Sequence, residues 1–570
     1  MKKITLILFT ICAFIGCQPT QTKTISKEKE PTIGPTGEQA MISSAHPLAT
    51  KVGVAILKDG GNAFDAAIAV QFALAVVFPR AGNIGGGGFA VYRKNDGEIG
   101  SLDFREKAPS SSSRDMYLDE EGNVIEGLST IGHKAAGVPG SVDGMFKLHE
   151  KYGSKPMKQL IQPAIDLAFY GFNITEDQAE VFNSKQEDFS KVNGSDFFLL
   201  REEGWKKDQQ VKFTELANTL TQIRDLGREG FYGGIVADQI VKEMHQGKGL
   251  ISSEDLKKYS SRWRDPLVGN YRGHKVISMP PPSSGGIALI QLLQGAEQFD
   301  IKNMGHNTGE TIHILTELER RVYADRATHL GDPDFYDVPV NMLLDEKYNE
   351  DRFSSISKNK KTDSQDIKEG EVEIIESVET THFSVVDPMG NAVSITTTLN
   401  SYFGSKVYVD GAGFFLNNEM DDFSSKPGIP NQFGLVGGEA NAIIPQKRML
   451  SSMTPTIIEK DGNVKMVVGT PGGSTIITSV FQTIMNVIDH DMSMQDAVNA
   501  TRTHSQWLPD IIVIEEREMG EESIKQLEKL GHKIVSRPSM GRMDCILIRE
   551  DGTLEGGADG TRGDNYAEGY

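Results

Sequence analysis

This 570-residue chain has few cysteines, no clustered histidines and fewer basic than acidic residues. Of three cysteines, Cys12 and Cys17 lie near the start and Cys545 stands alone, so the body can form no intramolecular disulfide and no thiolate metal cluster. The twelve histidines contain no HExxH and no close pair with ligand spacing, and we expect no metal and no cofactor. Acidic residues (79) outnumber basic ones (59), and a net charge of −20 argues against nucleic acid as a partner.

Long hydrophobic runs are also scarce, and the first one marks an export signal. Residues 1–16, within "MKKITLILFTICAFIGC", have a basic start and an apolar core too short to span a membrane. The last four of these letters resemble a bacterial lipobox, in which Cys17 would be lipidated; an ordinary signal peptide is the alternative. Residues 17–35 are polar and predict a flexible tether. We expect an exported, periplasmic protein that a lipid anchors to the membrane.

The remaining pattern favours an α/β fold. Hydrophobic residues (38%) and charged residues (24%) exclude a disordered or multi-span membrane protein. Residues 46–78 are helical in pattern and so rich in Ala and Val that they must be buried nearly all round. "NIGGGGF" leads into a strand but lacks the context of a dinucleotide site. Helices that alternate with strands without regular βαβ spacing predict layered sheets with helices outside.

A threonine-rich hairpin follows residue 379. "THFSVVD" and "AVSITTTLN" are β-rich runs around "PMGN", a turn sequence. The spacing places Thr380 opposite Leu399, within one residue of register, so that Thr398 and Asn400 flank it. An ordinary hairpin is the alternative interpretation, because threonine is a good strand former.

The segment before the hairpin makes an ordinary hairpin a less favoured interpretation. Residues of about 353–373 are mostly polar and predict a flexible tail that leads toward Thr380. A threonine hydroxyl is a poor nucleophile without a base beside it. A cut before Thr380 would free an α-amine whose reference pKa is about 8, against about 10.4 for lysine, and which could accept the hydroxyl proton.

Two glycines stand at the start of a predicted helix, residues 475–488. In "GTPGGSTII", the backbone N–H groups of Gly472 and Gly473 are suited to an anion or a developing oxyanion. A plain glycine turn with Ser474 as the helix cap is the alternative. No Lys follows as in a P-loop.

Charged and hydroxyl residues suited to an amino-acid group occur in separate motifs. Arg105 in "LDFREKAP" could hold a carboxylate with two hydrogen bonds, and Glu419 with Asp422 in "LNNEMDDF" could hold an ammonium. Ser451 and Ser452 in "LSSMTP" add hydroxyl donors. Taken singly, such groups are usually solvated loops and turns.

Together the motifs closely resemble the γ-glutamyltransferase (γ-glutamyltranspeptidase) family of the N-terminal nucleophile hydrolases. The resemblance implies a four-layer αββα sandwich, made as one precursor and cut between Glu379 and Thr380 into a large subunit, 36–379, and a small catalytic subunit, 380–570. It runs through nearly the whole chain in the motifs "GGNAFDAA", "NIGGGGF", "LDFREKAP", "MPPPSSGG", "ADRATHLGDPDF", "TTHFSVVD", "LNNEMDDF", "KPGIP", "LSSMTPTI" and "GTPGGS".

The family's chemistry implies a role for each matching residue. Thr380 would attack the γ-glutamyl amide of glutathione or a related compound, with its own α-amine as base, and pass the glutamyl group to water or to an amino acid or dipeptide. Thr398 would orient this nucleophile, and Gly472 and Gly473 would form the oxyanion hole. The expected substrate contacts are Arg105, Ser451 and Ser452 at the α-carboxylate and Asn400, Glu419 and Asp422 at the α-amino group.

Some positions depart from parts of the family, and two other functions remain in view. Phe433 stands where a lid tyrosine often sits, so lid closure is expected to depend on packing alone. Glu419 stands where some bacterial members have glutamine. A cephalosporin-acylase-like amidase would keep the nucleophile but change the carboxylate and ammonium contacts. A non-catalytic surface lipoprotein that binds a small ligand would be expected to lack Thr380, Thr398 or the glycine pair.

Overall fold

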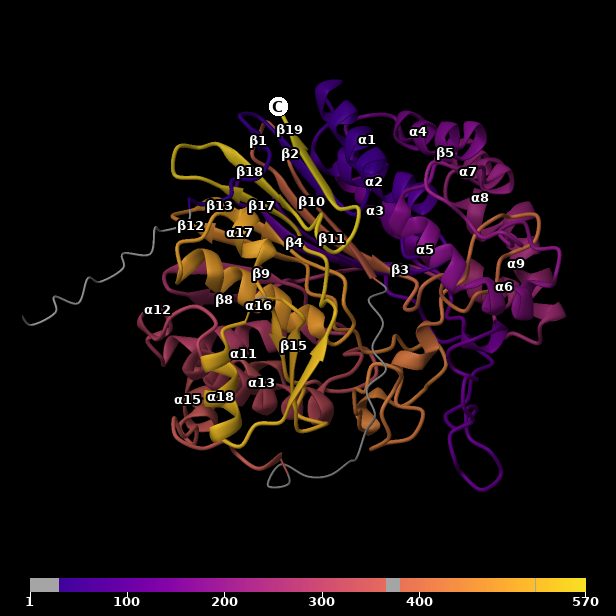
Figure 1. Ribbon diagram of the computed structural model, residues 1–570. Helices are drawn as coiled ribbons and strands as arrows, with labels where there is room; N and C mark the ends of the chain where they lie inside the picture. The colour runs from indigo at the N-terminus through magenta and orange to yellow at the C-terminus, as the bar shows by residue number, and fades with distance from the viewer. Residues whose placement is uncertain (1–29, 365–379, 518) are drawn as a thin grey trace, which may run out of the picture.

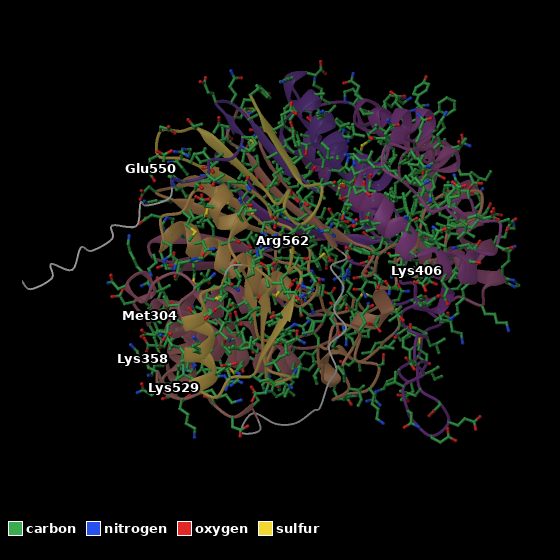
Figure 2. All side chains as sticks on the ribbon, in the orientation of Figure 1. Met304, Lys358, Lys406, Lys529, Glu550 and Arg562 are labelled. Carbon is green, nitrogen blue, oxygen red and sulfur yellow. The ribbon has the colours of Figure 1, made fainter. Side chains whose placement is uncertain are left out.

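The computed structural model describes residues 30–364, 380–517 and 519–570. Within these ranges two seven-stranded antiparallel sheets stack face to face, and helices cover the outer face of each (Figure 1). This αββα arrangement confirms the predicted fold class. Charged side chains such as Glu550 and Lys529 lie at the periphery, whereas Arg562 lies near the middle (Figure 2).

Sheet I carries the hairpin that begins at Thr380. Its strands, in spatial order, are β19 (Tyr566–Gly569), β2 (Met41–Ser44), β10 (Thr380–Val386), β11 (Ala392–Thr398), β3 (Gly87–Arg93), β4 (Ile99–Asp103) and β7 (Arg262–Arg264). Sheet II faces it. Its strands are β1 (Thr36–Gly37), β18 (Leu554–Ala558), β17 (Asp544–Ile548), β13 (Asn463–Val468), β12 (Thr456–Lys460), β9 (His274–Ser278) and β8 (Leu267–Tyr271).

Both sheets mix strands from before and after Thr380. In sheet I, β10 lies between β2 and β11, and β11 pairs in turn with β3. In sheet II, β12 pairs with β9, and β18 pairs with β1. The predicted cut therefore does not separate two folding units, because each sheet needs strands from both sides of it.

The helices form the two outer layers. Those on sheet I come mainly from the first half of the chain, and those on sheet II mainly from the second (Figure 1). The first group is α1 (Pro47–Lys58), α2 (Ala63–Val77), α3 (Ser141–Tyr152), α4 (Met157–Tyr170), α5 (Glu176–Ser184), α6 (Gln186–Asn193), α7 (Thr214–Leu226), α8 (Glu229–Tyr232), α9 (Gly234–Gln246) and α10 (Ser253–Lys258). The second is α11 (Gly285–Glu297), α12 (Ile301–Met304), α13 (Gly309–His329), α14 (Val340–Leu343), α15 (Glu346–Phe353), α16 (Thr475–Ile488), α17 (Met494–Asn499) and α18 (Glu521–Lys529).

Smaller strands complete the described structure. The hairpin of β5 (Phe172–Asn173) and β6 (Gln210–Val211) lies among the first helices, and β14 (Thr503–His504), β15 (Ile512–Glu515) and β16 (Ile534–Arg537) form a separate three-stranded sheet. No helix in the described ranges is long and apolar enough to cross a membrane.

Helix α2 is buried along its whole length, as its composition predicts. Its start is set by a capping box: the Asn62 side chain accepts from the Asp65 N–H, and the Asp65 carboxylate accepts from the Asn62 N–H. The helix lies against β10 and β11 on one side and α4 on the other, which explains why no polar face is needed.

The β10–β11 hairpin is shifted by one residue from the main prediction. Thr380 pairs with Thr398 and not with Leu399, within the one-residue tolerance of the expectation. Asp387 leaves the ladder, because one of its carboxylate oxygens accepts from the N–H groups of Met389 and Asn391 and closes the turn. All residues of both strands are buried, since sheet I lies between α2 and sheet II.

Two segments predicted to be flexible make defined contacts. In the predicted tether, Thr32 N donates to Asp496 Oδ2 at 2.9 Å and Gly34 N to Glu555 Oε1 at 3.1 Å. Residues 30–35 thus lie on α17 and β18, contrary to a free tether; residues 17–29 are outside the described ranges.

The predicted tail is likewise attached where it is described. Thr362 N donates to a Glu317 carboxylate oxygen at 3.0 Å, and Arg321 donates to Ser355 Oγ at 3.1 Å. Residues 353–364 therefore pack on α13, because this helix presents buried charges that need partners. Residues 365–373 lie outside the described ranges.

Candidate active site

Thr380 is the first residue of β10, a central strand of sheet I, and its side chain is buried beside the end of β11. Its Oγ1 donates to Thr398 Oγ1 at 3.4 Å. Thr398 Oγ1 also accepts from the backbone N–H of Asn400 at 2.8 Å, which holds this hydroxyl in place. The cross-strand pairing of two threonines thus gives the neighbour that the hairpin sequence predicts.

One pocket collects nearly all the predicted site residues. Its walls come from the ends of strands and from loops that are far apart in sequence. The lining residues are Arg105, Arg326, Thr380, Thr398, Asn400, Glu419, Asp422, Phe433, Leu435, Ser451, Ser452, Met453, Gly473 and Ile476. The cavity measures about 20 Å³, room for about one water molecule, so a glutamyl group needs the surrounding side chains or loops to move.

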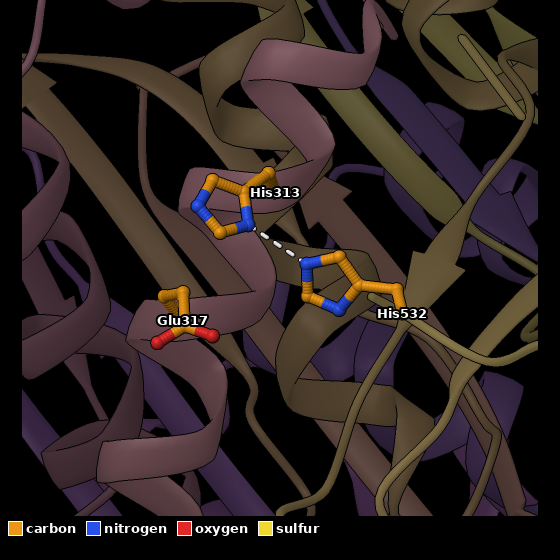
Figure 3. Close-up of side chains that lie close together, drawn as sticks. All are labelled: His313, Glu317 and His532. Carbon is orange, nitrogen blue, oxygen red and sulfur yellow. Dashed lines mark hydrogen bonds between the residues drawn. The ribbon is translucent and has the colours of Figure 1, made fainter. Parts of the chain in front are cut away.

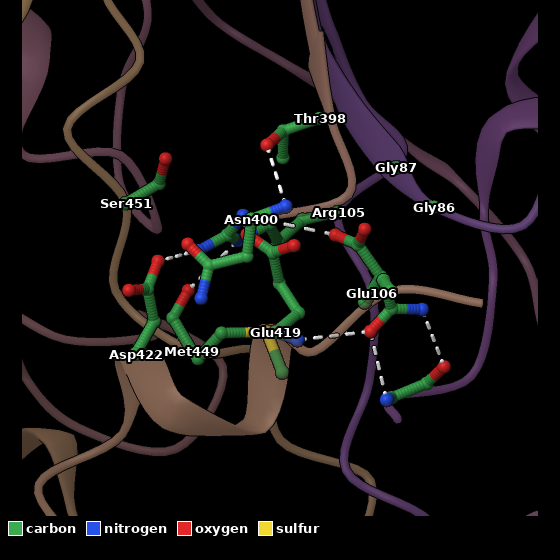
Figure 4. Close-up of polar contacts among 12 residues, drawn as sticks. Gly86, Gly87, Arg105, Glu106, Thr398, Asn400, Glu419, Asp422, Met449 and Ser451 are labelled. Atoms are coloured by element: carbon green, nitrogen blue, oxygen red, sulfur yellow. Dashed lines mark hydrogen bonds and ion pairs between the residues drawn. The ribbon is translucent and has the colours of Figure 1, made fainter. Parts of the chain in front are cut away.

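Arg105 lies at the centre of a buried charge cluster (Figure 4). Its guanidinium pairs with Glu419 through Nη1 and with Asp422 through Nη2, the latter at 2.5 Å. Burial raises the pKa of both acids, and Arg105 opposes this rise. The residues expected to hold a carboxylate and an ammonium are therefore in direct contact with each other.

A third carboxyl, Glu106, lies near Arg105 Nη1, the nitrogen that also pairs with Glu419 (Figure 4). Its Oε2 is 3.7 Å from Arg105 Nη1, and neither of its oxygens has a hydrogen-bond partner among the described residues. Burial raises the pKa of Glu106 to about 7. A Cβ on Gly87 would lie 2.6 Å from Glu106 Oε2, so a glycine as the first residue of β3 leaves room for this carboxyl.

The two serines are held by their backbone. Ser451 N donates to the Pro282 carbonyl at 3.0 Å, and the Ser451 carbonyl accepts from both Ser284 N (2.8 Å) and Ser284 Oγ (2.7 Å). Ser451 Oγ accepts from Met453 N at 3.1 Å, which leaves its hydroxyl proton to be donated. Ser451 is thus a rigid donor suited to an anion.

Gly472 and Gly473 precede α16 with φ values of 143° and 54°. Neither N–H donates to an acceptor within the described part of the chain, although the two carbonyls accept from Thr475 and Ile476. Gly473 lines the pocket with Thr380, whereas Gly472 lies just outside its lining. Free N–H groups at a helix start beside a hydroxyl nucleophile suit an oxyanion.

The loop that carries Phe433 closes over the pocket. The buried Phe433 ring lies against Gly473, where a Cβ would be 2.8 Å from a ring carbon. Polar contacts also hold this loop: Asn431 Nδ2 donates to Asp422 Oδ1 at 3.2 Å, and Gln432 N to Asp421 Oδ2 at 3.0 Å. The prediction that closure depends on packing alone is wrong, because Asp422 of the predicted site binds a loop side chain and its neighbour Asp421 binds the loop backbone.

Two residues for which the sequence predicted no role, Arg326 and Glu106, lie at the site. Arg326 lines the pocket and donates to Ser452 Oγ at 3.2 Å, and Glu106 contacts Arg105. Both lie within quoted motifs, "ADRATHLGDPDF" and "LDFREKAP". The sequence signal that could have indicated a role for them is a charged residue within a motif whose neighbours are buried. Two other predicted positions, Cys17 and Glu379, lie outside the described ranges.

One further cluster has the composition of a metal site. His313 and Glu317 on α13 face His532, and His313 Nδ1 is 2.7 Å from His532 Nε2 (Figure 3). The Glu317 oxygens, however, already accept from Arg320, Arg321 and Thr362. We therefore interpret the cluster as a buried ion-pair network, because a saturated carboxylate has no lone pair directed at a metal.

A much larger cavity lies away from Thr380. It measures about 780 Å³, and aromatic and acidic side chains such as Phe197, Phe198 and Glu215 line it. None of the predicted site residues reaches it. Cavity volume alone therefore does not identify the active site. The smaller pocket is identified by the nucleophile, hydrogen-bond donors and charged groups that converge on it.

Comparisons with known proteins agree with this geometry. A family model described as Gamma-glutamyltranspeptidase matches residues 49–570. The glutathione hydrolase proenzyme of Escherichia coli (strain K12) is 44% identical over 535 residues, which cover 94% of this chain and 92% of that protein. The crystal structure of a cephalosporin acylase from Bacillus halodurans has a TM-score of 0.82 at 26% identity and covers 97% of this chain and 99% of its own.

A solved member of the matched family is also similar. The crystal structure of Helicobacter pylori gamma-glutamyltranspeptidase has a TM-score of 0.56 at 45% identity, and the match covers 60% of this chain and 96% of that one. The family model spans well over half of the sequence, and the curated relative is similar along almost its full length. The chain therefore belongs to the γ-glutamyltranspeptidase family.

Proposed function

We propose that this chain cleaves itself before Thr380 and then hydrolyses or transfers the γ-glutamyl group of glutathione and related compounds. Membership of the family makes it an enzyme of γ-glutamyl hydrolysis and transfer that is made as one precursor. The observation that carries the residue assignment is the burial of Thr380 beside Thr398 in a pocket that also holds Arg105, Glu419 and Asp422.

Processing would start with the Thr380 hydroxyl. Its oxygen attacks the carbonyl carbon of residue 379, the C–N bond breaks, and the nitrogen takes up the proton and becomes a free amine. Water then hydrolyses the resulting ester. The products are a carboxylate on Glu379 and a hydroxyl and an amine on Thr380, so one residue now carries both nucleophile and base.

Turnover would repeat the same chemistry on a substrate. The Thr380 amine accepts the hydroxyl proton, the oxygen attacks the γ-amide, and the proton passes to the leaving nitrogen. The N–H groups of Gly472 and Gly473 would stabilise the oxyanion. Water or an amine then attacks the glutamyl ester, which releases glutamate or a new γ-glutamyl amide.

Recognition would require the charge cluster to open. The substrate α-carboxylate would take the place of Glu419 and Asp422 at Arg105 and accept from Ser451 and Ser452, while its ammonium would bind these two released acids with Asn400 beside them. Arg105 and both acids would each gain a substrate group of opposite charge, so each buried charge stays compensated. The loop at Phe433 must move with it, because its Asn431 side chain is bonded to Asp422.

Glutathione turnover by the purified chain is the direct test. We expect glutamate release by the wild type and none by Thr380→Ala, and a denaturing gel with N-terminal sequencing should give a light chain that begins Thr-Thr-His-Phe. A processed protein that releases no glutamate from glutathione would contradict the proposed substrate. A full-length band would contradict self-processing.

A cephalosporin-acylase-like amidase is the second candidate, supported by the similarity to the Bacillus halodurans acylase along the chain. Such an amidase is expected to keep the nucleophile and to change the carboxylate and ammonium contacts. The pairing of Arg105 with Glu419 and Asp422 therefore favours an amino-acid group. Parallel assays with glutathione and a cephalosporin amide would separate the two.

For location, we propose that residues 1–16 are an export signal, that Cys17 carries a lipid, and that the enzyme lies in the periplasm. The lipobox-like sequence supports this. Cys17→Ala should move the protein from the membrane fraction to the soluble fraction, and mass spectrometry of the N-terminal peptide should show the acyl chains. A wild type without acyl chains would contradict the anchor.

A further inference from the structure

Arg326 is a buried cation without a carboxylate partner among the described residues. It lies in the last turn of α13, is 5% exposed and lines the Thr380 pocket. Arg105 in the same pocket pairs with two acids, but Arg326 forms no ion pair in the described structure and attracts Asp422 only from beyond ion-pair distance. Buried charges in proteins are normally paired, so this guanidinium is suited to an anion that enters the pocket.

The hydrogen bonds of Arg326 determine which way two hydroxyl protons point. Nε donates to Ser284 Oγ at 3.0 Å, and Nη2 donates to Ser452 Oγ at 3.2 Å. A guanidinium can only donate, so both serine oxygens act as acceptors here. The Ser284 hydroxyl in turn donates its own hydrogen bond to the Ser451 carbonyl.

Ser452 differs from Ser284 in where its proton can go. Within the described ranges its hydroxyl has no acceptor, and the side chain lines the pocket. With Arg326 on one side of the oxygen, the O–H is left to donate to a group inside the pocket. A carboxylate would satisfy this donor and would also compensate the charge of Arg326.

We propose that Arg326 is a positioning residue for the α-carboxylate of the γ-glutamyl substrate, because it holds Ser452 as a donor and supplies a second positive charge to the pocket. The inference rests on the proposed γ-glutamyl activity. It adds a residue behind the expected α-carboxylate contacts: loss of Arg326 should weaken the preference for a free α-carboxylate over an α-amide.

The test compares Arg326→Gln with the wild type on γ-glutamyl-p-nitroanilide and on its α-carboxamide analogue. Loss of a charge-assisted contact should raise KM for the carboxylate substrate roughly 10- to 100-fold, with kcat within about threefold. The preference for carboxylate over amide in kcat/KM should fall by the same factor. Arg326→Lys keeps the charge and should recover part of that preference.

A double-mutant cycle tests the link to Ser452. Ser452→Ala alone should raise KM. The double variant with Arg326→Gln should have a KM that is raised by less than the product of the two single-variant factors. Arg321→Gln is the matched control, since it removes another buried arginine of α13 whose partners lie outside the pocket. It should lower the unfolding temperature and leave KM unchanged.

Several outcomes would overturn the inference. One is an Arg326→Gln enzyme that processes normally and keeps the wild-type KM and carboxylate preference. Another is fully multiplicative effects of Arg326→Gln and Ser452→Ala. A wild type that turns over neither substrate would refute the proposed function instead, so the two failures are distinguishable.

Discussion

The hydroxyl oxygen of Thr380 lies 3.4 Å from that of Thr398, directly across the β10–β11 ladder. Because Thr398 also accepts from Asn400 N, its oxygen is fixed from two sides. The partner strand therefore acts as a support for the nucleophile, and the first prediction concerns this support.

Thr398→Ala should lower kcat by about 10- to 100-fold, because a nucleophile that can rotate away reacts more slowly. KM should change little. Thr398→Ser keeps the oxygen and should retain most activity. Steady-state kinetics on processed enzyme decide this; equal activities of the alanine and serine variants would contradict a role for the oxygen.

Gly473→Ala should lower kcat roughly 100-fold. The substitution strains a backbone at φ 54° and places a Cβ against the Phe433 ring, next to the proposed oxyanion hole. Gly462→Ala is the control, since Gly462 has φ 78° but open space around it. It should cost about 1 kcal/mol of stability and leave kcat unchanged. Similar kcat values for the two variants would contradict the assignment.

Glu106→Gln should change how stability depends on pH. In the folded protein the pKa of Glu106 is about 7, above its ordinary value, so the folded state holds a proton that the unfolded state has lost. The contribution of protonated Glu106 to the free energy of unfolding of the wild type is fully present below about pH 4.5 and is lost as pH rises through 7. The variant should thus gain stability relative to wild type between pH 5 and 8, by on the order of 3 kcal/mol.

Urea unfolding at pH 5 and pH 8 measures this effect. Glu121→Gln, in an exposed loop, serves as the control and should show no pH-dependent difference from wild type. A constant difference between Glu106→Gln and wild type across that range would show that Glu106 is ionised throughout.

Glu317→Ala should destabilise the fold by about 3–5 kcal/mol, since it removes the acid paired with buried Arg321 and leaves Arg320 paired with Asp510 alone among the described residues. Glu310→Ala, at the exposed start of the same helix, should change stability by less than about 0.5 kcal/mol. Dialysis against a chelator should leave the wild-type unfolding temperature unchanged, because the Glu317 oxygens are occupied by protein donors. A large drop would reveal a bound metal instead.

The processed chains should remain associated until the protein unfolds. Strands β10, β11 and β12 pair with β2, β3 and β9 from the other side of the cut, so separation would break both sheets. Size-exclusion chromatography should give a single complex at neutral pH whose two chains separate only in denaturant. Free light chain under native conditions would contradict this.

Local signals predicted several of the elements. Helix 475–488 was predicted with the bounds it has, and α2 is buried all round as its Ala- and Val-rich sequence indicates. The hairpin register was uncertain by one residue because the side chain of Asp387, and not the turn sequence alone, decides where pairing starts.

Charged contacts across the chain were much less predictable. Residues 353–364 are polar enough to suggest a free tail, yet Glu317 and Arg321, on a helix some 35 to 45 residues earlier, bind them. The loop at Phe433 is likewise held by Asp421 and Asp422. Such pairings depend on which buried charges lack a partner, and no local pattern reports that.

The sequence by itself determined which residue types are available: a threonine at a strand start, a glycine pair before a helix, and an arginine, two acids and two serines in separate motifs. Only the tertiary structure decided that Arg105 pairs with the very acids expected to hold an ammonium, and that Arg326 reaches Ser452 from α13 without an ion pair to any acid of the described ranges. The physical reason is burial. In a low-dielectric pocket each charge must find a partner in space, and the fold determines which partners are near.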